Sequence, residues 1–200
     1  MKRIIGVTGG VGAGKSEVLE ILKQEYGANV ILTDQVAKDL MEPGREGYRQ
    51  VAAFLGGEIL NPDGSINRPK MASVIFAQEE KRLGVNRLIH PLVWEEVLRE
   101  IKESQNPLQV VETALPEKQF RDICHEIWYV YTSEENRARR LAESRGYDEE
   151  RTAGMIKRQA SDEEFRAISH EVIDNNGSLD QTRLQIARLL SEQTAEESSQ

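Results

Sequence analysis

The order of apolar and polar positions along the chain predicts short β-strands that alternate with longer helices. The continuous apolar and aromatic run Ile127-Trp-Tyr-Val-Tyr131 is typical of a strand buried on both faces of a parallel sheet. Longer segments with a helical spacing of apolar residues separate such runs. The alternation predicts an α/β fold with a five-stranded parallel sheet flanked by helices. The strands are expected at residues 3–8, 29–32, 108–113, 127–132 and 171–173.

Local signals indicate several helix and turn boundaries. The segment Asn61-Pro-Asp-Gly64 predicts a tight turn. A helix is expected after Pro91, because apolar residues recur there at helical spacing. The expected core stripe of this helix consists of Val93, Trp94, Val97, Leu98 and Ile101. Capping boxes are expected at Thr132 with Glu135, Ser161 with Glu164, and Ser178 with Gln181.

The 200 residues fit one domain that carries helical additions. Residues 34–106 are mostly helical and too many for a simple crossover, so a subdomain on the substrate side is expected there. Residues 134–168 are densely charged and predict helices laced by i,i+4 ion pairs. The polar, acidic tail over residues 191–200 is expected to fray. The sheet and its helices are assigned to residues 1–33, 107–133 and 170–192.

Composition and charge narrow the function classes. The net charge of −8 and the lack of a Lys/Arg block argue against a nucleic-acid partner. Cys124 is the only cysteine, which excludes an internal disulfide and disfavours a cysteine-type zinc site. The chain begins directly with a strand, and no apolar run approaches the ~20 residues of a membrane span. A cytoplasmic protein without a membrane partner is expected.

Residues 9–16 match the pattern GxxxxGK[ST] of a phosphate-binding loop and lie between a strand and a helix. Glycines allow successive backbone N–H groups to curl around phosphate oxygens, and the following helix directs its positive end at the same anion. Lys15 is expected to reach the β- and γ-phosphates of ATP, and Ser16 to ligate Mg²⁺. The alternative is a glycine-rich turn that merely precedes a helix. We interpret the pattern as the P-loop NTPase fold, with nucleotide contacts at Gly9, Gly10, Val11, Gly12, Ala13, Gly14, Lys15, Ser16 and Glu17.

Among nucleotide-binding proteins, the other motifs favour a small-molecule kinase. The sequence lacks the Asn-Lys-x-Asp motif with which GTPases read their base. The third strand ends at Glu112, whose carboxylate could serve magnesium or its waters. In kinases of this kind, positioning and charge neutralisation provide most of the rate enhancement.

Asp34 is the best candidate for the carboxylate that orients an acceptor hydroxyl and takes its proton. It follows the second strand, and open parallel sheets bind ligands at the carboxyl ends of their strands. An aspartate at such a position also serves as a helix N-cap without any role in chemistry. Spacing alone leaves both interpretations open.

Over nearly its whole length the sequence resembles the dephospho-CoA kinase family. The phosphate-binding loop is generic to many kinases, whereas the ordered set of further blocks is specific to this family. The blocks that carry the resemblance are residues 5–16, 27–34 with 42–44, 61–68 with 74–77, 88–92, Gln159 and 172–178.

The resemblance implies an ATP- and Mg²⁺-dependent kinase that phosphorylates the ribose 3′-hydroxyl of dephospho-CoA to give coenzyme A. Asp34 would then be the carboxylate at that hydroxyl, while Lys15 and the loop would hold ATP. Arg140 and Arg145 would be arginines of a mobile lid, residues 134–168, that face the phosphates.

The resemblance also places residues around the adenine and around the acceptor. The turn at Asn176 and Gly177 would lie near the adenine of ATP, and Thr8, Arg68 and His90 would border the acceptor. For His90, the alternative is a residue at a helix start that holds the turn at Pro91.

Two positions depart from the family pattern. Leu32 stands where the family often has an aspartate, so only Asp34 can serve as the carboxylate there. The block after the third strand, residues 114–117, is one residue shorter than usual, so no role is assigned to Glu117. The rival hypotheses are a nucleoside monophosphate-type or other small-molecule kinase, and a regulatory module that binds ATP without catalysis.

Overall fold

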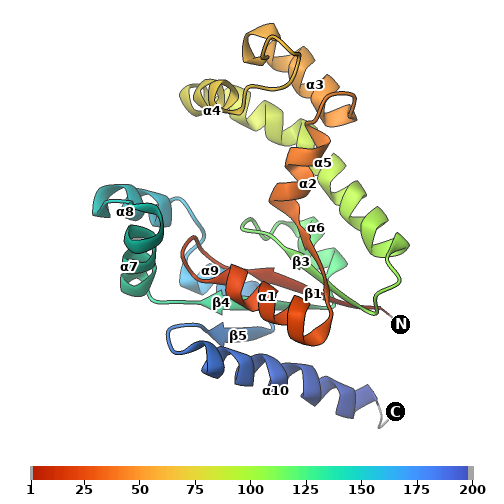
Figure 1. Cartoon of the computed structure of the whole chain (residues 1–200), viewed down its shortest axis with the longest axis vertical. Coiled ribbons are helices and arrows are strands. Elements are labelled where there is room, and N and C mark those ends of the chain that lie inside the picture. The colour runs from red at the N-terminus through yellow and green to blue at the C-terminus, as the bar shows by residue number, and fades with distance from the viewer. Residues whose placement is uncertain (1, 198–200) are drawn as a thin grey trace. The chain divides into compact units, whose positions relative to one another are not determined.

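The computed structural model describes the backbone of residues 2–197 and the side chains of residues 2–191. Within these residues, one parallel sheet has the strand order β2-β3-β1-β4-β5, which places the first strand at the centre (Figure 1). The predicted strand positions are confirmed to within one residue at each end. The strands are β1 (Arg3–Thr8), β2 (Asn29–Leu32), β3 (Leu108–Glu112), β4 (Glu126–Tyr131) and β5 (Glu171–Asp174).

The chain divides into two compact units within β2. The first unit comprises residues 1–30 and 105–200, and the second comprises residues 31–104. Helices of the first unit are α1 (Lys15–Tyr26), α6 (Lys118–Ile123), α7 (Glu134–Arg145), α8 (Glu149–Lys157), α9 (Asp162–Ile168) and α10 (Leu179–Glu197). Those of the second unit are α2 (Thr33–Leu40), α3 (Glu46–Leu55), the short 3₁₀ helix η1 (Gly57–Ile59), α4 (Arg68–Ala77) and α5 (Glu79–Glu103).

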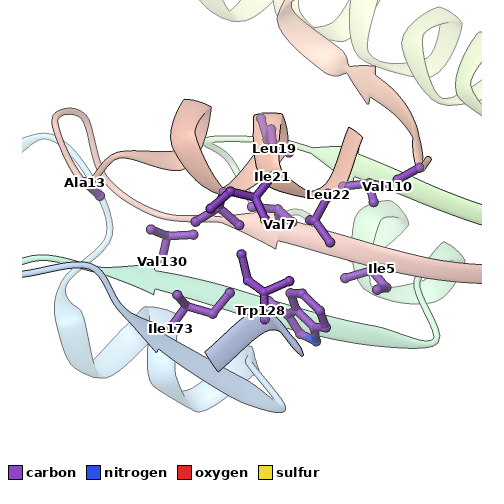
Figure 2. Packing of buried hydrophobic residues seen from close by; sticks show 13 residues of the cluster. Ile5, Val7, Ala13, Leu19, Ile21, Leu22, Val110, Trp128, Val130 and Ile173 are labelled. Atoms are coloured by element: carbon purple, nitrogen blue, oxygen red, sulfur yellow. The ribbon is translucent and has the colours of Figure 1, made fainter. Parts of the chain in front are cut away.

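One face of the sheet packs on α1 and α10. Side chains alternate across a strand, so Ile5 and Val7 of β1 and Trp128 of β4 share this face with Leu22 of α1 (Figure 2). All four are fully buried, as is Ile186 of α10. Removing this apolar surface from water is the main driving force for assembling the first unit.

The intervening residues face the other side of the sheet, which α6 and α9 cover. A Cβ on Gly6 would lie 2.5 Å from the ring of Phe120 in α6, so only glycine fits there. Tyr129 of β4 stacks on Phe165 of α9 with 4.9 Å between ring centroids. Cys124 is buried at the end of α6, and burial raises the pKa of its thiol to about 12, which makes it unreactive at neutral pH.

The second unit is built on α5, against which α2, α3 and α4 pack. Pro91 lies inside α5, so the prediction that a helix starts after Pro91, with His90 at its start, is wrong. The proline ring removes one backbone hydrogen bond, yet the helix continues because buried residues such as Ile89 and Val93 flank the proline on both sides. Leu98 is 51% exposed, so its assignment to the core stripe is also wrong, whereas the other four members of the stripe are buried.

The predicted caps are confirmed at two helices and wrong at the third. Ser161 and Glu164 form a capping box, and Ser178 and Gln181 exchange the same pair of hydrogen bonds. At α7 the N-cap is Ser133, because the Thr132 hydroxyl is buried and donates to a loop carbonyl instead. The hydrogen bond to the distant Ala13 carbonyl thus replaces the expected cap at the start of α7.

The remaining local predictions concern a turn and the C-terminal tail. The turn at Asn61 is confirmed by the hydrogen bond from Gly64 N–H to the Asn61 carbonyl, at 2.9 Å. The backbone of α10 continues past Ser191 to Glu197, where fraying was expected, and residues 198–200 lie outside the described residues. No helix in the described part of the chain is long and apolar enough to cross a membrane.

A buried carboxylate joins the ends of two strands and the last helix. Glu126 accepts from Arg3 Nε at 2.6 Å and from the indole N–H of Trp128 at 2.8 Å. The Arg3 guanidinium also donates to the carbonyls of Leu189 and Leu190 in α10.

Replacing Glu126 with alanine should lower the free energy of unfolding by about 2–3 kcal/mol, because a buried indole and a largely buried guanidinium lose their acceptor. Glu126→Gln should cost about 1 kcal/mol, since the amide oxygen can still accept from Trp128. Urea unfolding followed by tryptophan fluorescence would measure both losses. Glu171→Ala, at an exposed strand position, serves as the control and should stay within about 0.5 kcal/mol of the original protein. Equal losses for all three variants would contradict this account of Glu126.

Candidate functional site

The glycine-rich loop connects the central strand β1 to α1 in the first unit. Gly14, the N-cap of α1, has φ 87° and has no side chain that could accept from the first N–H groups of the helix. A Cβ on Gly9 would lie 2.6 Å from the carbonyl oxygen of Val130, so β4 prevents any larger residue there. The loop therefore presents backbone donors at the positive end of a helix, which is the geometry of an anion site.

Lys15 is held near the loop by oxygen atoms. Its Nζ donates to the Gly9 carbonyl at 2.9 Å and lies 3.6 Å from Glu112 Oε1 at the end of β3. The side chains of Lys15 and Glu112 are mostly buried, with 15% and 12% of their surface exposed. Ser16 is exposed in the first turn of α1. The carboxyl ends of β1 and β3 thus bring Lys15 and Glu112 together, and Ser16 follows Lys15 in α1.

Arg137 of α7 is the main residue that the sequence analysis missed. Its guanidinium is buried and donates to the Val11 carbonyl and to Gln159 Oε1, each at 2.8 Å. Gln159 also accepts from Val11 N–H at 2.9 Å. Burial lowers the pKa of Arg137 from its ordinary value, and the guanidinium remains charged at neutral pH. The available signal was its position one helical turn before Arg140, on the same face of α7.

The two predicted lid arginines lie in different places. Arg140 donates from Nη2 to the Asn175 carbonyl at 2.7 Å and from Nη1 toward the Ala13 carbonyl at 3.5 Å, so it lies beside the loop. Arg145, the last residue of α7, is exposed and lies 6.0 Å from the ring of Tyr147. The structure therefore brings Arg140 to the loop, whereas Arg145 lies beside Tyr147.

The predicted adenine turn is tied to the start of α7. Asn176 Oδ1 accepts from Ser133 N–H and from Asn136 Nδ2, each at 2.9 Å. The Asn176 side chain is thus occupied, while Gly177 next to it is exposed.

Thr8 closes β1 and is fully buried. Its hydroxyl donates to the Thr113 carbonyl at 2.9 Å, which links the carboxyl ends of β1 and β3. Thr8 is the residue predicted to border the acceptor, and its hydroxyl proton is already used in this internal hydrogen bond.

In the second unit, Asp34 lies in the first turn of α2 and is exposed. The N-cap of α2 is Leu32, so the interpretation of Asp34 as a helix N-cap is wrong. Arg68, at the start of α4, donates to the Lys38 carbonyl at 3.1 Å and to Glu42 Oε1 at 2.8 Å. His90 is half-buried in the middle of α5.

Three basic side chains are concentrated at the loop, although the net charge of the chain is −8. Lys15, Arg137 and Arg140 all have donors on oxygen atoms of the loop or its neighbours. Among the described residues, no three acidic, His or Cys side chains form a metal-binding group.

Comparison with known proteins gives a consistent result. The sequence model of the dephospho-CoA kinase family matches residues 3–181. A dephospho-CoA kinase of Carboxydothermus hydrogenoformans is 37% identical over 191 residues, which cover 94% of this chain and 92% of that protein. The structure of TT1252 from Thermus thermophilus matches with a TM-score of 0.80 at 26% identity and covers 96% of this chain and 97% of that one. A dephospho-CoA kinase from Campylobacter jejuni shares the fold, with a TM-score of 0.71 at 18% identity over 97% of this chain and 100% of that one.

Replacing Arg137 with leucine should lower the free energy of unfolding by about 2–4 kcal/mol, because the Val11 carbonyl and Gln159 would lose a buried charged donor. Arg139→Leu is the matched control, since Arg139 is exposed on the same helix, and should change stability by less than about 0.5 kcal/mol. Urea unfolding of the two variants gives the comparison. A loss as small for Arg137 as for Arg139 would show that the contact with the loop contributes nothing to the fold.

Proposed function

The chain belongs to the dephospho-CoA kinase family, and we propose that it transfers the γ-phosphate of ATP to the ribose 3′-hydroxyl of dephospho-CoA at the loop between β1 and α1. The product is coenzyme A, so the reaction is the last step of CoA biosynthesis. The observation that carries the proposal is the anion site itself: a glycine loop at a helix N-terminus with Lys15, Arg137 and Arg140 on its oxygen atoms.

Lys15 holds the β- and γ-phosphates in this proposal. Its present partners, the Gly9 carbonyl and the Glu112 carboxylate, keep the ammonium group near the loop. Phosphate oxygens would replace these partners and receive a charge that is already in place, which is how a preorganised site lowers a barrier. Mg²⁺, held by the phosphates and the Ser16 hydroxyl, would neutralise further charge on the transferred group.

Asp34 receives the proton of the acceptor hydroxyl. Its carboxylate is exposed and does not cap α2, so it is available to a ligand. On the acceptor side, the proposal assigns Arg68 as a cation for the phosphates of dephospho-CoA and His90 as a polar neighbour. Arg68 would exchange its exposed ion pair with Glu42 for such a phosphate at little cost, because exposed pairs contribute little.

The segment 134–168 acts as a lid in this proposal. Arg140 neutralises phosphate charge, and closure excludes water that would otherwise hydrolyse ATP. The planar donor fork of arginine suits this task, since it matches phosphate oxygens and stays charged. Arg145, now beside Tyr147, would reach the phosphates only when the segment rearranges.

Asp34→Asn should lower kcat by at least ~10²-fold and leave the affinity for ATP unchanged, because the amide is nearly isosteric but cannot take a proton. Asp39→Asn is the matched control: Asp39 is exposed on the same helix, and its variant should keep full turnover. Steady-state ADP release, with ATP binding measured by calorimetry, separates the two effects. Normal turnover of Asp34→Asn would remove Asp34 from the chemistry.

The acceptor is tested with a panel of dephospho-CoA, adenosine, AMP, CMP, shikimate and gluconate. Dephospho-CoA should give the highest kcat as well as the lowest KM, because binding energy from its pantetheine arm can align the reacting hydroxyl. The product should carry its new phosphate on the ribose 3′ position, as phosphorus NMR would report. Diphosphate formation from AMP or CMP with dephospho-CoA inert would favour a nucleoside monophosphate kinase. Tight ATP binding without turnover of any acceptor would favour a regulatory module.

A further inference from the structure

Asn175, the residue directly after β5, has a side chain that joins three parts of the first unit. It is 3% exposed, and none of the roles assigned above uses it. Its amide Nδ2 donates to the Ala13 carbonyl in the loop at 3.0 Å and to Glu17 Oε2 in α1 at 3.2 Å. Its Oδ1 accepts from the hydroxyl of Thr182, a fully buried residue of α10, at 2.7 Å. The Ala13 carbonyl and the Glu17 carboxylate fix which way the amide faces, because both can only accept and therefore require the NH₂ group on their side.

The main chain of Asn175 is equally engaged. Its N–H donates to the Tyr131 carbonyl at the end of β4, at 2.8 Å. Its carbonyl accepts from Arg140 Nη2 at 2.7 Å. One residue therefore contacts the loop, the first turn of α1, the end of β4 and the basic side chain from α7.

The Ala13 carbonyl is the point at which Asn175 acts on the loop. The Thr132 hydroxyl also lies within hydrogen-bonding distance of this carbonyl, at 2.9 Å. A trans peptide unit directs its C=O and its N–H to opposite sides. Holding the Ala13 carbonyl against Asn175 and Thr132 therefore directs the Gly14 N–H the other way, as a donor for an anion in the loop.

Packing around Gly14 supports the same arrangement. A Cβ built on Gly14 would collide with Asn175 Nδ2 and with Glu17 Oε2. The amide thus occupies the space that a side chain at position 14 would need, and it packs directly against Gly14. A role confined to the turn after β5 would not require this contact with Gly14.

We propose that Asn175 is a positioning residue for the phosphate donor. Its side-chain amide fixes the orientation of the Ala13–Gly14 peptide, and its main-chain carbonyl fixes the position of the Arg140 guanidinium. The Gly14 N–H and Arg140 then face the same phosphates. The inference rests on the proposed use of the loop for ATP, and it assigns Asn175 no contact with the nucleotide itself.

The test is Asn175→Asp, which keeps the shape and the acceptor for Thr182 but replaces a donor with a carboxylate facing the Ala13 carbonyl and Glu17. The dissociation constant of ATP with Mg²⁺, measured by calorimetry, should rise about tenfold or more, as for loss of a buried hydrogen bond. The KM for ATP should rise with it, while the KM for dephospho-CoA stays within about twofold, because the hydrogen bonds of Asn175 reach the loop and Arg140 and none of the residues assigned to the acceptor. Asn29→Asp makes the same chemical change at the amino end of β2, where Asn29 donates to Gln109, and should leave both constants unchanged.

A rescue variant separates positioning from general damage. In Asn175→Asp combined with Glu17→Gln, the new amide at position 17 can donate to the carboxylate at position 175 and removes the charge repulsion. ATP affinity should recover by about threefold or more relative to Asn175→Asp, as expected for residues in direct contact. No recovery would show that the pair does not act together on the loop and would overturn the inference.

If Asn175→Asp does not fold, Thr182→Val decides, because it removes only the hydroxyl that holds the amide oxygen in place. A folded Thr182→Val protein should bind ATP about threefold more weakly. Unchanged ATP affinity in either folded variant overturns the inference, even in an enzyme fully active on dephospho-CoA. Conversely, an original protein that binds ATP but never phosphorylates dephospho-CoA contradicts the proposed function alone, since the affinity comparison needs no acceptor.

Discussion

The structure depends on a constraint on the peptide groups of the glycine loop between β1 and α1. Backbone N–H groups that face an anion leave their carbonyls on the opposite side, where the protein must supply donors. Arg137 donates to the Val11 carbonyl, while Thr132 and Asn175 donate to the Ala13 carbonyl. These donors come from α7 and from the ends of β4 and β5. The phosphate site is therefore a property of the whole carboxyl edge of the sheet and not of the loop alone.

The charge arrangement follows from the same constraint. In a chain of net charge −8, an anionic ligand can be bound only where basic groups are concentrated and held. Lys15 lies 3.6 Å from Glu112, and Arg137 is buried with its charge matched by oxygen acceptors. Both charges are kept in place before a ligand arrives, so little reorganisation would be needed for the proposed exchange of the Lys15 acceptors for phosphate oxygens.

Local sequence signals were reliable where no distant group competed with them. The strands were predicted to within one residue because each is a short apolar run between polar segments, and the caps at Ser161 and Ser178 formed as expected. The cap at Thr132 failed because its hydroxyl found the Ala13 carbonyl, which is distant in sequence. The helix boundary at Pro91 failed for a similar reason, since buried residues on both sides outweigh the hydrogen bond that proline removes.

The sequence by itself determined the sheet, the phosphate loop and the family, because strand runs, glycine spacing and ordered motif blocks are all written in consecutive residues. It also identified Asp34, Lys15 and Arg140 as candidates, although it could not separate a catalytic Asp34 from a helix cap. Only the tertiary structure decided that Leu32 holds the cap position, that Arg137 and Asn175 support the loop, and that Arg145 lies beside Tyr147. The physical reason is that a buried hydrogen bond joins groups far apart in the chain, and its partners become neighbours only when parallel strands bring their carboxyl ends to one edge.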